Sequence, residues 1–302
     1  MLKNYNFVIY GANGWLGKAL TDYCLKQLKL DPTQIILISG SVEELTLQEG
    51  VRHPCYKFED VMKKRLENVI FFNFSFKLKD KLQELNTGNF LKENDQIKDK
   101  AEKLIRHLKP IKVIYSSSGA VTNPDPTLNP YGYQKLKDES FYEELCAALN
   151  IKLLIARIYN IAGPYMNKLD VYALGNFIKQ AKQTGKIEIS ANNPVIRNYI
   201  HIYDLMNILC AWAEDPEEED YINFSTGTEE EIELGELAKL VSEIMPGDIS
   251  IVRDYHDTDL PNRYVSDIEA QNILTEKYGI KLKNMKDCVR DTYNYLKTEK
   301  LI

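Results

Sequence analysis

The chain has 302 residues, of which 44% are hydrophobic and 27% are charged, and its formal net charge is −6. This composition is ordinary for a folded globular protein and excludes a chain that is largely disordered. A negative balance without a basic stripe excludes general binding to nucleic acid or to an anionic membrane surface.

The first half of the chain alternates short apolar runs with longer segments of helical periodicity. The apolar runs lie at 7–10, 35–39, 69–72, 113–115 and 153–156. Between the first two runs, apolar residues recur at the spacing of one helix face, at Leu16, Leu20, Cys24 and Leu28. Strands that alternate with helices predict an α/β fold with a Rossmann-type, doubly wound parallel sheet.

Beyond Gly163 and Pro164 the pattern changes to longer amphipathic segments, at 171–182 and 234–244, joined by acidic connectors such as 217–220. We therefore expect two domains. The first is a Rossmann domain over 1–164, to which 195–215 returns. The second is a smaller, mostly C-terminal α/β domain over 165–302 that binds the substrate.

A glycine-rich turn follows the first predicted strand. Gly11, Gly14 and Gly17 lie in the sequence GANGWLG, between that strand and the first predicted helix. Glycines in this place let the turn close and let the backbone approach a pyrophosphate, while the helix N-terminus offers N–H donors. The turn predicts a dinucleotide site, around which Trp15 and Leu16 pack as apolar residues.

The end of the second predicted strand bears on the choice of dinucleotide. An acidic side chain there would bind the adenosine ribose 2′-hydroxyl of NAD(H), but the chain has Ser39, Gly40 and Ser41. The two serine hydroxyls can bind the 2′-phosphate of NADP(H), although the turn contains no arginine to pair with it. We favour NADP(H) over NAD(H) and leave both open.

A second motif carries the chemistry of proton transfer. Tyr131 and Lys135 are one helical turn apart, so both side chains can reach one bound molecule. A nearby ammonium lowers the pKa of a phenol, which makes tyrosine a usable base. The strand that ends at Ser118 brings a hydroxyl to the same crevice, because parallel sheets bind ligands at the carboxyl ends of their strands.

These motifs occur in an order that resembles the extended short-chain dehydrogenase/reductase family, in particular its nucleotide-sugar epimerase, reductase and dehydratase branch. The resemblance covers nearly the whole chain and rests on GANGWLG, VIYSSSGAV, YGYQK, ARIYNIAGP and RNYIHIYDL. It implies that Tyr131 is the general acid or base, that Lys135 holds the nicotinamide ribose, and that Ser118 binds the reacting sugar oxygen.

The resemblance also implies wider sets of binding residues. Asn94 supports the active-site architecture, and Arg197 contacts a nucleotide diphosphate, with Arg263 as a second candidate. His201 and Asp204 are expected to be structural. The residues assigned to the dinucleotide are Gly11, Asn13, Gly14, Trp15, Leu16, Gly17, Ser39, Ser41, Asn73, Phe74, Asn94, Ser116, Tyr131, Lys135 and Ile158. The residues assigned to the substrate are Ser75, Ser118, Asn160, Arg197 and Arg263.

Departures from the family pattern narrow the expected reaction. Gly119 and Ala120 stand where dehydratases have an acidic pair, and no cysteine lies near Ser118 as in the 3,5-epimerase/reductase type. We expect NAD(P)-dependent reduction of a 4-keto sugar nucleotide, with an NAD-dependent 4-epimerase or a non-catalytic dinucleotide sensor as alternatives. Phe74 replaces a small family residue beside the cofactor, so its ring must point away or reshape the pocket.

The remaining expectations concern location and assembly. Five cysteines without a CxxC spacing predict neither a disulfide framework nor a metal site, and they fit a reducing cytoplasm. No apolar run is long enough to cross a bilayer. The resemblance implies a homodimer, with the predicted helix over 131–149 at its interface.

Overall fold

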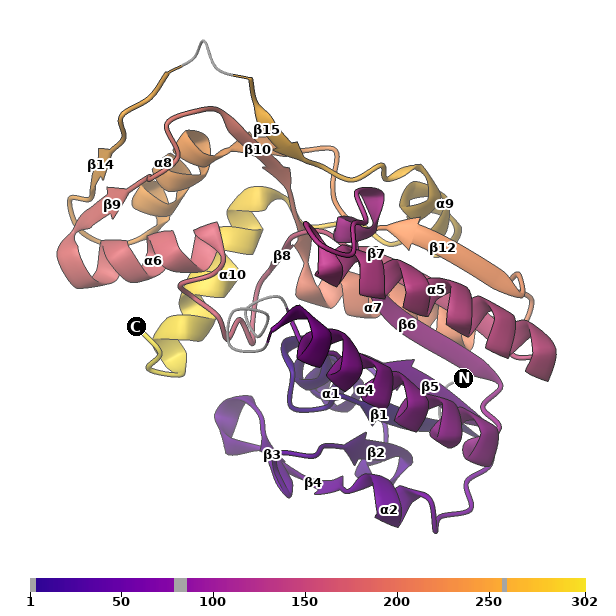
Figure 1. The fold of residues 1–302 in the computed structure, drawn as a ribbon. Helices are drawn as coiled ribbons and strands as arrows, with labels where there is room; N and C mark the ends of the chain where they lie inside the picture. Colours follow the sequence, from indigo (N-terminus) through magenta and orange to yellow (C-terminus); the bar gives the residue numbers. More distant parts are fainter. Residues whose placement is uncertain (1–3, 79–85, 257–259) are drawn as a thin grey trace. The chain divides into compact units, whose positions relative to one another are not determined.

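The computed structural model describes residues 4–78, 86–256 and 260–302 (Figure 1). It divides into two compact units. The first consists of Met1–Ile158 and Leu209–Phe224, and the second of Tyr159–Ile208 and Ser225–Ile302. The compact units therefore part at 158 rather than 164, and the segment that returns to the first unit is 209–224.

An eight-stranded sheet forms the centre of the first unit. Its order is β12-β7-β6-β5-β1-β2-β4-β3. The strands are β1 (Asn6–Tyr10), β2 (Ile35–Ile38), β3 (Glu44–Thr46), β4 (Arg52–Tyr56), β5 (Val69–Asn73), β6 (Lys112–Ser118), β7 (Lys152–Ile158) and β12 (Tyr221–Ser225). β1 pairs in parallel with both β2 and β5, so the strand order reverses beside β1. This arrangement confirms the predicted Rossmann-type fold.

The two faces of the sheet carry alternate residues of the apolar runs. Val8 and Phe71 face a core cluster to which α4 (Thr87–Leu108) and α5 (Pro130–Leu149) contribute. Phe7 and Phe72 point to the opposite face, where their rings stack 5.3 Å apart. Because both faces are buried, the strands are apolar almost throughout, as parallel strands usually are.

Two lysines hold the returning segment against the sheet. α7 (Ile202–Glu214) ends beside β6, where the Lys112 ammonium donates to the carbonyl oxygens of Trp212, at 2.6 Å, and Asp215. A cation at a helix C-terminus satisfies carbonyl groups that the helix leaves unpaired. Lys152 donates in the same way to the carbonyl oxygen of Pro216 at 3.2 Å.

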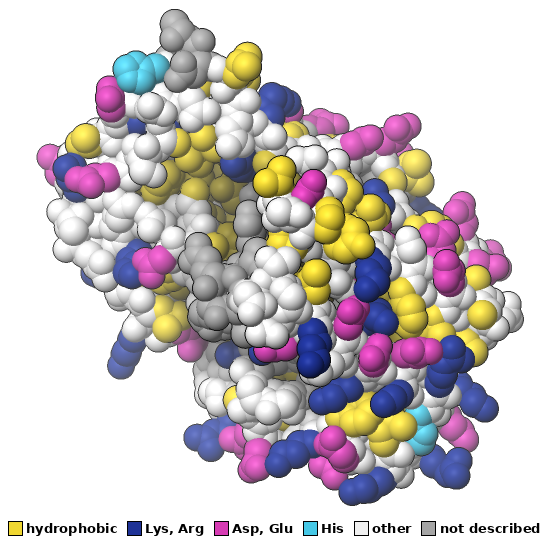
Figure 2. Space-filling view, viewed as in Figure 1, with side chains coloured by type: hydrophobic (Ala, Val, Ile, Leu, Met, Phe, Trp, Pro, Cys, Tyr) yellow, Lys and Arg dark blue, Asp and Glu magenta, His cyan; other side chains and the backbone are white. Residues whose placement is uncertain are grey.

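The surface formed by α4 and α5 carries charges of both signs. Figure 2 shows lysine and arginine side chains interspersed with aspartate and glutamate over this face of the first unit. Ion pairs such as Arg106 with Glu102, 2.8 Å apart, connect some of them. A mixed distribution of this kind creates no extended field that would attract a polyanion.

The second unit combines small sheets with helices, as predicted for the C-terminal part. Its sheets are β13-β10-β15, β11-β8 and β14-β9. The strands are β8 (Ile161–Ala162), β9 (Lys186–Glu188), β10 (Val195–Asn198), β11 (Ile200–His201), β13 (Glu231–Glu233), β14 (Ser250–Val252) and β15 (Asn262–Tyr264). The helices are α6 (Ala173–Thr184), α8 (Leu234–Ile244), α9 (Glu269–Lys277) and α10 (Met285–Thr298).

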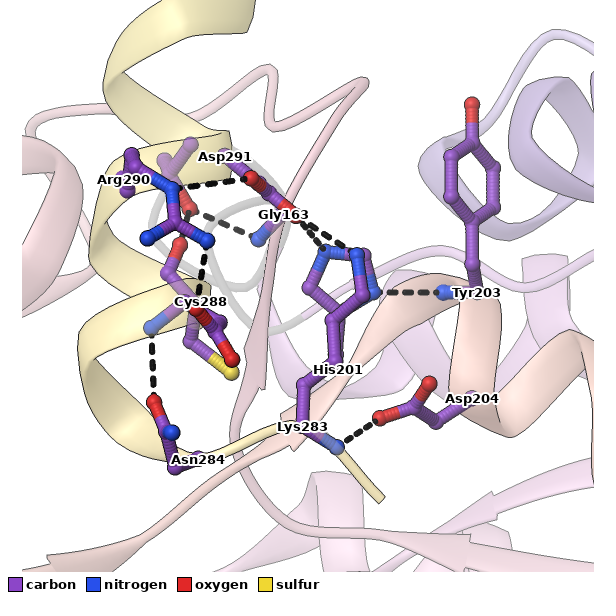
Figure 3. A network of polar contacts seen from close by, with 11 residues as sticks. Gly163, His201, Tyr203, Asp204, Lys283, Asn284, Cys288, Arg290 and Asp291 are labelled. Atoms are coloured by element: carbon purple, nitrogen blue, oxygen red, sulfur yellow. Dashed lines mark hydrogen bonds and ion pairs between the residues drawn. The ribbon is translucent and has the colours of Figure 1, made fainter. Parts of the chain in front are cut away.

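A buried histidine connects β11 to α10 (Figure 3). His201 is fully buried, and its Nδ1 accepts the Tyr203 backbone N–H at 3.2 Å, so its hydrogen lies on Nε2. That Nε2 faces Asp291 Oδ2 at 3.4 Å, and the Lys283 ammonium lies 2.6 Å from the same oxygen.

These contacts stabilise the charged form of one carboxylate in the second unit. The contact with His201, followed by Lys283, lowers the pKa of Asp291 to about 2. Asp204 accepts the Lys283 backbone N–H at 2.7 Å, which ties the chain before α10 to α7. His201 and Asp204 therefore have a structural role in this unit.

Replacement of Asp291 by asparagine is expected to lower the free energy of unfolding at pH 7 by about 1 to 2 kcal/mol. The Asp291 pKa lies below its value in the unfolded chain, so the carboxylate stabilises the fold above about pH 4. That contribution disappears as the pH falls through about 2. When urea unfolding is followed by circular dichroism, the difference in free energy of unfolding between the variant and wild type should be smaller at pH 3 than at pH 7.

Asp170 provides a matched control in the same unit, because it is exposed and pairs with Lys179 at the surface. Its replacement by asparagine should change the free energy of unfolding by less than about 0.5 kcal/mol. A loss in the Asp291 variant that is the same at both pH values would contradict the charge-based explanation.

Candidate active site

The predicted catalytic and cofactor residues all lie in the first unit, some at the carboxyl ends of its parallel strands and others on the helices α1, α4 and α5. β1, β2, β5, β6 and β7 each contribute at least one of them, directly or in the turn that follows. Tyr10 of β1 is in register with Asn73 of β5, which is in register with Tyr115 of β6. The adjacent strands therefore end at one edge of the sheet, where doubly wound folds bind their ligands.

The glycine-rich turn is shaped by close backbone approaches. Gly11 has a φ of +93°, and a β-carbon there would lie 2.7 Å from the Ser75 backbone nitrogen. α1 (Trp15–Lys26) begins after Gly14, which is exposed, and no side chain caps this helix end. Backbone N–H groups in the first turn of a helix have no intrahelical acceptor and can bind an anion. This geometry fits the pyrophosphate of a dinucleotide.

Three of the predicted cofactor residues contact one another after β2. The Ser39 hydroxyl oxygen accepts the backbone N–H groups of Ser41 and Val42, at 3.2 and 3.3 Å. Asn13 donates to the Ser41 hydroxyl at 3.2 Å. The structure therefore brings Asn13, Ser39 and Ser41 together beside the glycine-rich turn, and the Ser39 oxygen accepts two hydrogen bonds from its own turn.

A connected set of hydrogen bonds holds Ser118 and the start of α5 together. The Ser118 hydroxyl accepts the Ala120 N–H at 3.2 Å and thereby caps the short helix η4 (Gly119–Thr122). The Ala120 carbonyl in turn accepts the Asn129 side chain at 2.9 Å, and Asn129 caps α5. A β-carbon at Gly132 would lie 2.2 Å from the Ala120 oxygen, so only glycine permits this contact. Ser118 and Tyr131 are thus positioned by the same few residues.

Lys135 is almost completely buried in the first unit. Its ammonium donates to the Ser116 carbonyl oxygen at 2.7 Å and lies 3.3 Å from the Tyr115 hydroxyl. It also lies 3.9 Å from the centre of the Phe76 ring and 4.7 Å from that of Tyr115. Burial lowers the pKa of the Lys135 ammonium. The aromatic faces and the carbonyl compensate part of the lost hydration.

Phe76 links the two catalytic candidates of α5. Its ring meets that of Tyr131 edge to face, with centroids 5.6 Å apart. The same ring also covers the Lys135 ammonium. Phe76 could not be identified from the sequence, because nothing in the pattern of 74–77 indicates where the chain turns after β5. Asp138 was not predicted either, although Lys135 and Asp138 stand at a spacing that places them on one helix face.

Asn94 positions the segment that carries Phe76. It is buried, its side-chain oxygen accepts the Lys77 N–H at 2.8 Å, and its amide group donates to the Phe90 carbonyl at 3.1 Å. Asn94 is therefore not a solvated residue of α4. Phe74 turns toward Phe72, with ring centroids 5.9 Å apart.

Several other assigned cofactor residues are used within the protein. The Asn73 amide donates to the Tyr142 hydroxyl at 2.8 Å, and its oxygen accepts the Ser75 N–H at 3.4 Å. The Ser116 hydroxyl donates to the Asn73 carbonyl at 3.3 Å. Ile158 is in register with Ser118 at the end of β7. These residues lie at or near the carboxyl ends of β5, β6 and β7.

The remaining substrate candidates lie in the second unit and do not gather at one point. Arg197 on β10 is half-buried and donates to the carbonyl oxygens of Ile196 and Asn262, both at 2.8 Å. Arg263 pairs with Glu231 at 2.7 Å. Because Ile196, and not Arg197, is in register with Arg263, the two arginines extend from opposite faces of the small sheet. The Asn160 amide donates to the Asn198 carbonyl at 2.9 Å.

Residues 4–78, 86–256 and 260–302 lack two features, a membrane-spanning helix and a cluster of metal-binding side chains. None of the helices described there is long and apolar enough to cross a membrane. The same residues contain no group of three or more histidine, cysteine, aspartate or glutamate side chains that could hold a metal ion.

Known proteins resemble the chain in sequence and in fold. Over 219 residues it is 26% identical to the UDP-glucose 4-epimerase of Mycoplasma genitalium, a match that spans 62% of this chain and 63% of that relative, less than two thirds of its length. The structure of a UDP-N-acetylglucosamine 4-epimerase from Methanobrevibacter ruminantium, in complex with UDP-N-acetylmuramic acid, has a TM-score of 0.78 at 16% identity and covers 98% of this chain and 99% of its own.

A third similar protein is RMD from Pseudomonas aeruginosa, whose structure is complexed with NADPH. It has a TM-score of 0.70 at 19% identity and covers 98% of this chain and 100% of its own. At such identities the two structures establish the fold alone. The family model of the NAD dependent epimerase/dehydratase family matches residues 7–224, most of the chain. The chain therefore belongs to the NAD dependent epimerase/dehydratase family.

Proposed function

We propose that the protein is a nucleotide-sugar 4-epimerase that uses NAD(H). The observation that carries this proposal is that Ala120 and Asn129 connect Ser118 to the start of α5, which carries Tyr131, while Lys135 of the same helix donates to the Ser116 carbonyl. The Mycoplasma relative and the Methanobrevibacter protein are both nucleotide-sugar 4-epimerases.

The chemistry can be assigned to individual side chains of the first unit. In this proposal Ser118 holds the oxygen on C4 of the sugar, and Tyr131 removes the proton of that hydroxyl and later returns it. The Lys135 ammonium favours the phenolate form of Tyr131 and binds the nicotinamide ribose. When bound, the dinucleotide supplies the acceptor and donor of the hydride. The turn from Gly11 to Gly17 holds its pyrophosphate.

Net reduction of a 4-keto sugar nucleotide by NADPH is the second candidate. It is favoured by the absence of a carboxylate at Ser39, Gly40 and Ser41, which follow β2, and it uses the same catalytic side chains. We place it second because the turn that contains Ser39 and Ser41 has no lysine or arginine that could pair with the 2′-phosphate.

A homodimer is part of the proposal and rests on the family resemblance. The apolar positions of α5 divide between two environments. Leu145 lies in the core of its own unit, while Ala148 is exposed and available to a partner. Sedimentation of the purified protein measures the oligomeric state directly.

The bound nucleotide distinguishes the two candidate reactions. Acid release from the purified protein, followed by chromatography, is expected to yield NAD, because an epimerase regenerates its cofactor in every cycle. Protein that is empty when purified, and that binds NADPH at least about tenfold more tightly than NADH in a fluorescence titration, would support the reductase instead.

Replacement of Tyr131 by phenylalanine is expected to reduce interconversion of UDP-glucose and UDP-galactose by about 10²- to 10⁴-fold, because the variant has no acid–base group at C4. The affinity for the dinucleotide should stay within about twofold, since the ring and Lys135 remain. Tyr133→Phe is the matched control, because Tyr133 lies on the exposed side of the same helix and should retain full activity. Equal losses in both variants would refute the assigned role.

Replacement of Arg197 by methionine is expected to raise KM for the nucleotide sugar by about 10- to 100-fold with little change in kcat, the loss of a charge-assisted contact to phosphate. Arg263→Met should change KM by less than about threefold, because Arg263 is engaged by Glu231 on the other face of the sheet. Steady-state kinetics on both variants test this, and a larger effect from Arg263 would reverse the assignment.

A further inference from the structure

A buried carboxylate lies directly behind Lys135. Asp138 is one helical turn further along α5 and is 2% exposed. One of its oxygens accepts the Tyr115 hydroxyl at 3.1 Å, and the other accepts the Gln134 amide at 3.0 Å. A carboxylate is seldom buried unless a compensating charge is near. The nearby charge on the same helix face is the Lys135 ammonium.

The Tyr115 hydroxyl connects the two charged groups in a defined direction. It receives a hydrogen bond from Lys135 at 3.3 Å and donates its own hydrogen to Asp138. Tyr115 cannot swing out of this position, because it is buried and its ring packs on that of Tyr142 with centroids 4.6 Å apart. Hydrogen bonds in such a chain polarise and strengthen one another.

Other charged groups around Lys135, Tyr115 and Asp138 are already paired. Glu139 pairs with Arg157 at 2.6 Å, and Asp95 of α4 pairs with Lys137 at 3.3 Å. Burial raises the pKa of Asp138, whereas the Asp138 charge opposes the effect of burial on Lys135. The titratable groups that face the pair are Tyr131, Glu139 and Tyr142 from α5, Tyr115 from β6, and Asp95 and Lys98 from α4.

We propose that Asp138 is a positioning residue of the active site, which acts through the Tyr115 hydroxyl to keep the Lys135 ammonium charged and fixed against the Ser116 carbonyl. The functional meaning of this inference rests on the proposed catalytic role of Lys135. The contact itself, and its effect on the lysine, can be tested without any substrate.

The direct test measures the ionisation of Lys135. The purified protein is labelled with lysine carrying ¹³C at Cε, and the Lys135 resonance is identified by its absence from a Lys135→Met variant. Asp138→Asn keeps the shape of the side chain and removes its charge. Because the ammonium then loses its stabilising partner, its titration midpoint should fall by about one pH unit or more. Tyr115→Phe, which removes the bridging hydroxyl, should lower it as well.

Asp95→Asn is the matched control. Asp95 accepts the same Gln134 amide as Asp138, at 3.1 Å, but it lies at the surface and pairs with Lys137 instead of Lys135. Its removal should leave the Lys135 midpoint unchanged. An unshifted midpoint in a folded Asp138→Asn protein would overturn the proposal. If that variant does not fold, Tyr115→Phe decides, and an unshifted midpoint there overturns it equally.

The activity arm separates positioning from a merely structural effect. Activity that needs a charged Lys135 is lost as the pH rises through the lysine pKa, so the alkaline limb of the kcat profile should move to lower pH in Asp138→Asn by about the same amount as the midpoint. KM should stay within about twofold. If wild-type protein turns over no nucleotide sugar, the proposed function fails, while the lysine titration still decides the role of Asp138.

Discussion

The burial of one ammonium group, that of Lys135, determines much of the arrangement in the first unit. A buried cation that lacks hydrogen-bond acceptors would lose its proton or remain in water. The Ser116 carbonyl and the Tyr115 hydroxyl provide the acceptors, and two aromatic rings cover the rest. Tyr115 and Ser116 lie within β6 and Phe76 lies just beyond β5, so these two adjacent strands must keep their register for the lysine to be satisfied.

The same constraint extends to the glycine-rich turn. Gly11 lies so close to the backbone of Ser75 that a β-carbon would not fit, and the chain from Ser75 leads directly to Phe76. Asn94 holds the far side of this segment through Lys77. The glycine-rich turn therefore contacts the segment whose Phe76 ring covers Lys135. A substitution at Gly11 should disturb the lysine as well as the dinucleotide.

The sequence predicts the parts of this unit that repeat a local pattern. The central strands were found because their apolar runs are nearly continuous, and α5 because Tyr131 and Lys135 open a recognisable helix. The β3–β4 hairpin was missed, since β3 has one buried residue, Leu45, between two exposed ones. Asp138 was missed for a different reason: its spacing from Lys135 is visible, but most helical carboxylates are solvated, and its burial depends on Tyr115 from a distant strand.

The sequence does not show from which face of a sheet a side chain extends when that face depends on the pairing of distant strands. The sequence offers Arg197 as the phosphate ligand and Arg263 as a second candidate, but it does not show whether their side chains share a face. Their faces differ only because β10 and β15 pair with Ile196 opposite Arg263. A shift of that pairing by one residue would have placed both guanidinium groups on the same face. Motif resemblance transfers a position along the chain and leaves the direction of the side chain undetermined.

Electrostatics at the end of β2 also separates the two candidate reactions. A ribose 2′-phosphate carries nearly two charges and needs cations or several free donors. The turn that contains Ser39 and Ser41 has no lysine or arginine, and the nearest arginine along the chain, Arg52, pairs with Glu44 at 3.3 Å. The protein as a whole is negatively charged. This charge balance is the physical reason why the proposed function uses NAD(H), whose ribose 2′-hydroxyl is neutral, and with it a reaction that regenerates its cofactor.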